Sequence, residues 1–449
     1  MTRTHDRAPK TLTWALASAV CMAVLSGPAL WNGFALLQYD TGGYLARWYE
    51  GYLVPSRAVV YGLILNAGSL GDFWPVVLVQ SAATVWIVAL TLRCCGLGGR
   101  PFLLTILVSA LSVFTTLPWL TSILLTDIFC GLGVLALALL LLGTLTALER
   151  AGLIALIAIS AATHSATLAV LAAQLCAVPL LAWSGWTVSW PRIRDCILAL
   201  ALGVILVFTA NFAIAGRLAW TPGGFALSFG RMLQDGIVDR YLADHCPDTM
   251  LRLCAYRTQL PRDADEFFWG NDIFISLGRF AGLGHEMERI ALGSIAEYPA
   301  LQIKTAAIAA LKQLIDVRTG EGVVRDIWHT YAIIEHHTPW VVPAMKAARQ
   351  QQNGISFDLM NRLHWPVALL GFVLAAGVAA GGTMRLDPTV RWLAAMTVAA
   401  ILANALVCGV LSNPHDRYGA RLAWLPPLCV ALAVMRLRHR DGNNRRPQS

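Results

Sequence analysis

Long apolar runs separated by short polar connections occupy most of this chain. A helix rises about 1.5 Å per residue, so about 20 apolar residues cross the roughly 30 Å hydrocarbon core of a bilayer. The pattern predicts an all-α polytopic membrane protein with about ten transmembrane helices. A short fifth run and a further apolar stretch at 299–315 leave this count open by one. The predicted spans are 12–30, 73–92, 102–118, 123–143, 151–163, 166–183, 196–216, 365–383, 392–411 and 421–436.

The composition supports this class. Of the 449 residues, 57% are hydrophobic and 13% are charged, against about 45–50% and 25% in soluble domains. The mean hydropathy of +0.60 is too high for apolar residues confined to one buried core. A water-soluble enzyme is therefore excluded. The net charge of +8 comes from basic clusters between the apolar runs and at the chain ends. Such clusters are typical of topology signals, so we expect no nucleic-acid partner.

The basic connections predict the orientation of the chain. With the N-terminus in the cytoplasm, every arginine-rich connection falls on the cytoplasmic side, as the positive-inside rule requires. The first apolar run lacks a clear signal-peptide cleavage site and is interpreted as a retained helix. Both termini are then cytoplasmic, and we expect a multi-pass protein of the bacterial inner membrane. The basic residues concerned are Arg3, Arg7, Lys10, Arg93, Arg100, Arg150, Arg192, Arg194, Arg385, Arg391, Arg436, Arg438, Arg440, Arg445 and Arg446.

This topology divides the chain into five parts. The outer face receives the first outer loop and the large extracytoplasmic segment, which alone has the charge density of a soluble domain and is predicted to be largely helical, with interfacial helices. The parts are a cytoplasmic N-terminus (1–11), a bundle of seven helices (12–216) with a first outer loop (31–72), the extracytoplasmic segment (217–364), three C-terminal membrane helices (365–436) and a basic cytoplasmic tail (437–449).

Two cysteines lie in the outer segment. Cys246 and Cys254 are eight positions apart on the side that is oxidising in a bacterium, which favours a local disulfide over free thiols. The other eight cysteines fall in or beside apolar runs. The chain contains no CxxC pair, so no structural zinc site is indicated.

The first outer loop contains the sharpest candidate for chemistry. Asp40 follows Tyr39 in a glycine-rich turn, about ten positions after the first apolar run, with Tyr44 and Arg57 nearby. An acidic residue in this place can reach a substrate headgroup at the bilayer surface, so the two tyrosines and Arg57 are candidate substrate-binding residues. The structural alternative is that Asp40 caps the helix that starts near Tyr44.

Two further candidates lie at outer ends of predicted spans. Asp127 falls near the outer end of the fourth span, and a carboxylate at this depth usually faces a cavity or an ionic partner. The alternative is a structural pair with Arg417 or Arg421. His164 lies at the outer turn between the fifth and sixth spans, where a satisfied interfacial histidine is equally expected. We interpret Asp40, Asp127 and His164 as the catalytic candidates.

The last outer loop is a dense polar cluster between two apolar helices. Two arginines four positions apart near a helix N-terminus predict a site for a phosphate or diphosphate. The alternative is that they neutralise the neighbouring aspartate and lipid headgroups. The candidate binding residues are His415, Asp416, Arg417, Tyr418 and Arg421.

Together these residues resemble the GT-C class of integral-membrane glycosyltransferases, which includes the protein O-mannosyltransferases and the aminoarabinose transferases of lipid A. The resemblance covers about residues 12–220 and rests on the many helices, the long first outer loop and Asp40 after helix one; Asp127 corresponds to a second acid of that class. It implies sugar transfer from a polyprenyl-phosphate donor to an envelope glycan, lipid or protein, with Asp40 as general base. Thr41 stands where an acidic pair is found in that class, which leaves a divalent metal an open possibility and no cofactor certain.

Other functions remain open from the sequence. A transporter or flippase for a lipid-linked or anionic solute is less favoured, because charges are nearly absent from the middle of the spans. An acyl or phospho-group transferase is a third class, with His164 or His415 as base.

Overall fold

The computed structural model describes residues 7–50, 57–183, 185–221, 224–381 and 386–444, and this part of the chain is helical without any strand. One isolated parallel bridge joins Leu36 and Ile123. The helices before the outer segment are α1 (Arg7–Leu25), α2 (Gly27–Asn32), α3 (Thr41–Glu50), α4 (Val59–Ser69), α5 (Trp74–Cys94), α6 (Pro101–Phe114), α7 (Leu117–Ser122), α8 (Asp127–Leu142), α9 (Ala147–Thr163), α10 (Ser165–Cys176), α11 (Val178–Trp183) and α12 (Trp190–Ala215). The C-terminal helices of the bundle are α21 (Asp358–Ala380), α22 (Pro388–Leu411), α23 (Asp416–Ala420) and α24 (Leu425–Asn444).

Helices occupy each of the ten predicted spans, and five segments are long and apolar enough to cross a membrane. These five are Trp74–Cys94, Trp190–Ala215, Asp358–Ala380, Pro388–Leu411 and Asp416–Arg438. The remaining runs form shorter apolar helices or, like α9, helices with charged first turns. The protein is therefore a helical protein with membrane-spanning features, while the count of ten spans stays a prediction.

Helix α8 forms the centre of the bundle. All its residues from Asp127 to Leu141 are buried, and it packs against α5, α9, α10, α12 and α22. A helix that is apolar all round is buried either by other helices or by lipid, and α8 is buried by its neighbouring helices. Its first residue is Asp127, so the carboxylate of Asp127 lies at the N-terminal end of this central helix.

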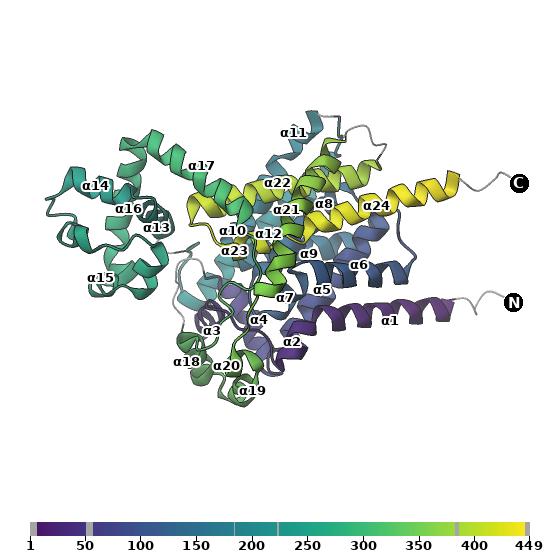
Figure 1. The fold of residues 1–449 in the computed structure, drawn as a ribbon, viewed down its shortest axis with the longest axis horizontal. Coiled ribbons are helices and arrows are strands. Elements are labelled where there is room, and N and C mark those ends of the chain that lie inside the picture. The colour runs from purple at the N-terminus through teal and green to yellow at the C-terminus, as the bar shows by residue number, and fades with distance from the viewer. Residues whose placement is uncertain (1–6, 51–56, 184, 222–223, 382–385, 445–449) are drawn as a thin grey trace, which may run out of the picture.

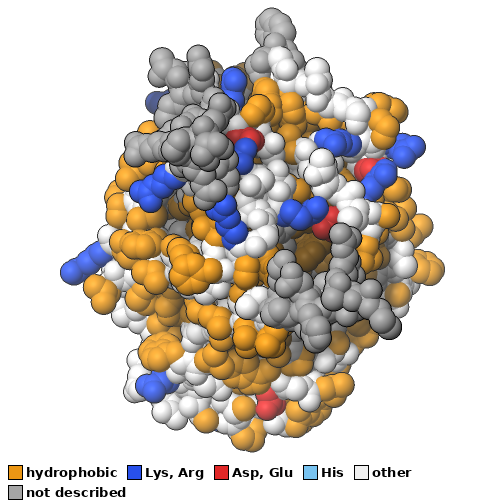
Figure 2. Space-filling model, turned by 90° about the vertical axis from the view of Figure 1, so that its right-hand side faces the viewer, with side chains coloured by type: hydrophobic (Ala, Val, Ile, Leu, Met, Phe, Trp, Pro, Cys, Tyr) orange, Lys and Arg blue, Asp and Glu red, His pale blue; other side chains and the backbone are white. Residues whose placement is uncertain are grey.

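The N-terminal end of α1 and the C-terminal end of α24 lie at the same end of the bundle, at the right of Figure 1. Figure 2 looks at this end and shows Lys and Arg side chains between apolar ones. Ion pairs join neighbouring connections: Arg93 binds Glu149 at 2.7 Å, and Arg436 binds Asp387. This arrangement agrees with the grouping of basic connections on one side, while the side of the membrane they face stays a prediction.

The first outer loop is helical over much of its described length. Helices α3 and α4 pack against each other. Tyr44 on α3 and Tyr61 on α4 are both buried, with their ring centroids 5.3 Å apart and the rings edge to face. Helices α3 and α4 of this loop are therefore packed parts of the core.

The outer segment separates into two parts joined by α17 (Figure 1). One part is a lobe with its own apolar core, in which Cys246 and Cys254 form a disulfide. The other part packs over α3 and belongs to the main core. The lobe contains α13 (Phe225–Gln234), α14 (Ile237–His245), the 3₁₀ helix Arg252–Gln259, the π-helix Glu266–Gly270, α15 (Asp272–Ser276) and α16 (Arg279–Glu297). Helix α17 (Pro299–Ile315) packs against α22, and α18 (Trp328–His337), a 3₁₀ turn (Pro339–Val341), α19 (Val342–Ala347) and α20 (Arg349–Asn353) form the second part.

Candidate functional site

Asp40 lies in a turn that is tied to the segment before α8. Thr41 Oγ1 accepts a hydrogen bond from the backbone of Gln38 and donates one to the Leu124 carbonyl, at 3.0 Å each. The backbone of Leu36 pairs with Ser122 and Leu124 on either side of the single bridge. These contacts place the turn that carries Asp40 beside the start of the central helix.

Two arginines clamp the Asp40 carboxylate. Arg417 Nη1 donates to Oδ2 at 2.7 Å, and Arg57 Nη2 donates to Oδ1. The three side chains are 11–17% exposed. The side chain of Asp40 is therefore engaged in an ionic group rather than in capping α3. The predicted candidates from the first and last outer loops meet here across 377 positions of sequence.

This clamp determines the charge of Asp40. Burial by itself raises the pKa of the carboxyl, but the positive charges of Arg57 and Arg417 outweigh it and hold the pKa well below its usual range. Asp40 is therefore ionised throughout the physiological pH range, and in this state it is a weak base.

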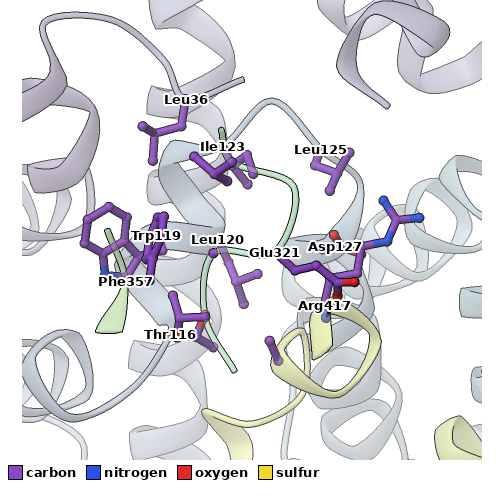
Figure 3. A pocket seen from close by; sticks show the side chains of 14 residues that line it. Leu36, Thr116, Trp119, Leu120, Ile123, Leu125, Asp127, Glu321, Phe357 and Arg417 are labelled. Atoms are coloured by element: carbon purple, nitrogen blue, oxygen red, sulfur yellow. Dashed lines mark hydrogen bonds between the residues drawn. The ribbon is translucent and has the colours of Figure 1, made fainter. Parts of the chain in front are cut away.

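A pocket with one charged end adjoins the clamp (Figure 3). In Figure 3, Asp127, Glu321 and Arg417 lie together at one end, and Trp119 and Phe357 lie at the other. Those two rings contact each other with centroids 4.8 Å apart. The complete lining is Leu36, Thr116, Trp119, Leu120, Ile123, Leu125, Asp127, Thr319, Gly320, Glu321, Val323, Phe357, Arg417 and Ala420. The lining thus combines an apolar wall with a charged end that carries Asp127, Glu321 and Arg417.

Asp127 is a buried carboxylate at the charged end of the pocket. It is 5% exposed and forms no ion pair with another described residue, so neither predicted pairing, with Arg417 or with Arg421, is present as a direct contact. A buried carboxylate without a direct counter-ion is costly unless a ligand or water completes it. Asp127 is therefore available to a ligand, whereas Asp40 is already paired.

Glu321 is a functional candidate that the sequence reasoning missed. Its carboxylate accepts hydrogen bonds from His415 Nδ1 and from the backbone of Arg417, both at 2.7 Å. Gly320 and Gly322 flank it with positive φ angles of 95° and 75°, which glycine adopts most readily. An acid between two such glycines, Gly-Glu-Gly, was the one signal in the sequence that marked this turn.

The other residues of the last outer loop have separate partners. Asp416 accepts from the backbone of Arg318 at 2.9 Å, so the two predicted arginines do not neutralise it. The Tyr418 ring lies beside Arg417, whose guanidinium carbon is 4.9 Å from the ring centroid. His415 Nε2 lies 3.5 Å from Asp265 of the lobe. This loop therefore joins the lobe, the Glu321 turn and the clamp.

Arg421 lies deeper than predicted. It is fully buried, and it donates to Asn404 Oδ1 at 2.5 and 3.0 Å and to Cys408 Sγ at 3.1 Å. The pocket lining includes Arg417 but not Arg421. Arg417 and Arg421 therefore have different partners. The second arginine that binds the Asp40 carboxylate is Arg57 rather than Arg421.

The remaining candidates surround the site at varying distance. His164 Nδ1 is buried without a hydrogen-bond partner among the described residues. Tyr44 shares a 3.4 Å hydrogen bond with Thr126, next to Asp127. Tyr39 is 47% exposed, and its carbonyl accepts from His329 Nε2 at 2.6 Å. Tyr39 therefore lies at the exposed edge of the candidate site rather than in its buried interior.

Among the described residues, no group of three or more His, Cys, Asp or Glu side chains is arranged to hold a metal ion. No family model, no curated protein and no solved structure matches this sequence. The chemistry of the site must therefore be argued from its own residues.

Proposed function

We propose that the protein is a membrane glycosyltransferase that moves a sugar from a polyprenyl-phosphate donor to a cell-envelope acceptor, on the extracytoplasmic face of a bacterial inner membrane. The observation that carries the proposal is the apolar pocket that ends at Arg417, directly beside the clamped carboxylate of Asp40. The apolar wall suits a prenyl chain, and the arginine suits its phosphate.

The proposed reaction uses the two arginines and the carboxylates in different ways. The hydroxyl oxygen of the acceptor forms a bond to the anomeric carbon while the bond from that carbon to the phosphate oxygen breaks. The electron pair stays on the phosphate, where Arg417 stabilises it. The hydroxyl proton passes to Asp40, and polyprenyl phosphate leaves. Asp127 is free to face the sugar ring, where a carboxylate stabilises the positive charge that develops.

An exchange of ion pairs reconciles this role with the state of Asp40. Clamped by Arg57 and Arg417, the carboxylate is a weak base. A donor phosphate that binds Arg417 takes that guanidinium from Asp40 Oδ2, which raises the proton affinity of Asp40. The base is thus activated only when the donor is present, which limits abstraction of acceptor protons in its absence.

The experiment uses purified protein in lipid nanodiscs with a panel of polyprenyl-phosphate sugars, and mass spectrometry follows release of polyprenyl phosphate. We expect release with one class of donor, and loss of at least two orders of magnitude in Asp40→Asn. Asp244→Asn is the matched control, because it removes the same charge from an exposed ion pair with Arg240 in the lobe. Absence of release from folded protein with every donor contradicts the proposal and favours transport, which a flux assay then measures.

A further inference from the structure

A second pocket lies on the other side of the clamp, between α4, α9 and α12. Its lining includes Arg57, Val59, Ser165, Val207, Asn211 and Trp220. It shares no lining residue with the first pocket. We call it the α4–α12 pocket.

The two pockets are linked through the carboxylate of Asp40, which lines neither of them. Arg57 lines the α4–α12 pocket and binds Asp40 Oδ1, whereas Arg417 lines the first pocket and binds Oδ2. The two oxygens of a carboxylate are about 2.2 Å apart by standard covalent geometry. A group held in either pocket therefore lies beside an arginine that binds Asp40, and a transfer between two substrates requires both of them to be brought close to one reacting centre.

The α4–α12 pocket has an apolar side and a polar side. Val59, Val60 and Val207 supply the apolar side. On the polar side, Asn211 Nδ2 holds the carbonyls of Ala219 and Trp220 at 2.7 and 2.9 Å.

A further hydrogen bond fixes the aromatic ring on that polar side. Trp220 Nε1 donates to Ser165 Oγ at 3.1 Å. The indole ring is thus held by the Ser165 hydroxyl, in a pocket whose lining also includes Arg57, and it adds an apolar surface to the polar side. These are the features that bind the faces and hydroxyls of a sugar or polyol.

The surroundings of the pocket indicate where a ligand enters. Beside Val207, helix α12 exposes Ile205, Leu206 and Phe212, at 56%, 40% and 54%. Val207 therefore joins the pocket to an exposed apolar surface of one of the five segments that are long and apolar enough to span a membrane. A hydrocarbon chain has access from the bilayer, while a folded protein substrate would have to approach from water.

We propose that the α4–α12 pocket binds the acceptor, and that the acceptor is an amphiphile with a hydroxylated headgroup on a hydrocarbon chain. The assignment of the ligand as an acceptor rests on the glycosyltransferase proposal above, whereas the binding of a ligand in this pocket does not. The headgroup lies against Trp220 and beside Arg57, with a hydroxyl directed to Asp40 Oδ1. The chain lies along the valines toward α12.

The test is photolabelling of the full-length protein in nanodiscs with dodecyl β-glucoside that carries a diazirine on its alkyl chain. We expect labelled peptides from 57–60 and 207–221, protection by unlabelled dodecyl glucoside, and no protection by farnesyl phosphate. A diazirine-bearing dodecane without the sugar is the control probe and should label without saturation. Label confined to other segments, or equal saturable labelling by both probes, overturns the proposal.

One variant that adds bulk to the pocket and one that removes bulk from it make the test independent of folding defects. Val207→Trp fills the pocket, and Leu198→Trp places the same ring on a 48% exposed position of α12 that is more than two turns away from Val207 and outside the pocket lining. We expect at least a tenfold loss of saturable label in Val207→Trp and none in Leu198→Trp. Trp220→Ala, which adds no bulk, should lose label tenfold as well, and wild-type labelling of Trp220→Ala overturns the proposal.

The release assay keeps the two proposals separable. Labelling of the α4–α12 pocket without donor turnover contradicts the glycosyltransferase proposal but leaves a glycolipid-binding pocket. Donor turnover without labelling contradicts the acceptor site and leaves the glycosyltransferase proposal intact.

Discussion

Replacement of Asp40 by asparagine tests the ion-pair exchange, because exchange and simple positioning of Arg417 predict opposite changes in the affinity for a phosphate-bearing lipid. Asparagine keeps the size of the side chain and one carbonyl oxygen but removes the charge that competes with a donor phosphate for Arg417. If exchange occurs, the variant binds a phosphate-bearing lipid more tightly although it turns over more slowly. If Asp40 only positions the arginine, the variant binds the lipid more weakly.

The structure gives the size of the expected effect. Arg417 Nη1 and Asp40 Oδ2 are 2.7 Å apart, with the side chains 17% and 11% exposed. At an effective dielectric constant near 20, opposite charges about 4 Å apart attract by about 4 kcal/mol. Desolvation and the hydrogen bond that asparagine retains offset more than half of this. About 1.5 kcal/mol remains, which corresponds to roughly tenfold tighter binding.

Isothermal titration calorimetry with farnesyl phosphate measures this affinity without turnover. We expect Asp40→Asn to lower the dissociation constant about tenfold and Asp244→Asn to leave it unchanged. Equal or weaker binding by folded Asp40→Asn refutes the exchange, because the phosphate then gains nothing from removal of the carboxylate.

Three further predictions follow from the same contacts. Arg417→Gln should raise the KM for the donor at least tenfold, whereas Arg318→Gln should not, and equal KM values would remove Arg417 from phosphate binding. Burial opposes protonation of His415, but Glu321 and Asp265 together raise its pKa above the usual 6.5. The ionic contacts of His415 with these two carboxylates therefore contribute their whole stabilisation below pH 6.5 and are lost as the pH rises through the raised pKa. Amide exchange in 263–270, corrected for chemical exchange, should therefore increase between pH 6 and 9 in wild type but not in His415→Gln; a pH-independent wild type contradicts this. Cys254→Ser should cost the lobe about 2.5 kcal/mol, since the disulfide closes a loop of sequence separation eight; protease resistance of the lobe in urea measures it, and an unchanged midpoint would show that the crosslink does not stabilise the lobe.

The helices of the bundle could be predicted because each depends on its own run of residues. Apolar runs at the right length form helices wherever they occur, and the structure has a helix at every predicted span. Helix α4 was less visible, since its 11 residues are too short to cross a bilayer and fell inside the predicted outer loop. Its burial depends on α3, α5 and α12, which the local pattern does not contain.

The candidate site was predictable in part. The side chains of Asp40, Arg57 and Arg417 are brought together, and Asp127 lines the adjoining pocket. Arg421 was grouped with Arg417 by spacing, yet it donates to Asn404 in the core. Glu321 was missed because its only signal is the pair of flanking glycines, which indicates a turn but not the partners that the turn meets.

The sequence by itself determined that this is a helical protein with membrane-spanning features and basic connections, because hydropathy and charge act residue by residue along the chain. Only the tertiary structure decided which charges meet. Asp40 and Arg417 are 377 positions apart, and Glu321 reaches His415 across 94. Such pairs depend on how whole helices pack, because a short side chain finds its partner only after the backbone of both segments has been placed. The same packing put a pocket on each side of Asp40, and no local pattern in the sequence contained that arrangement.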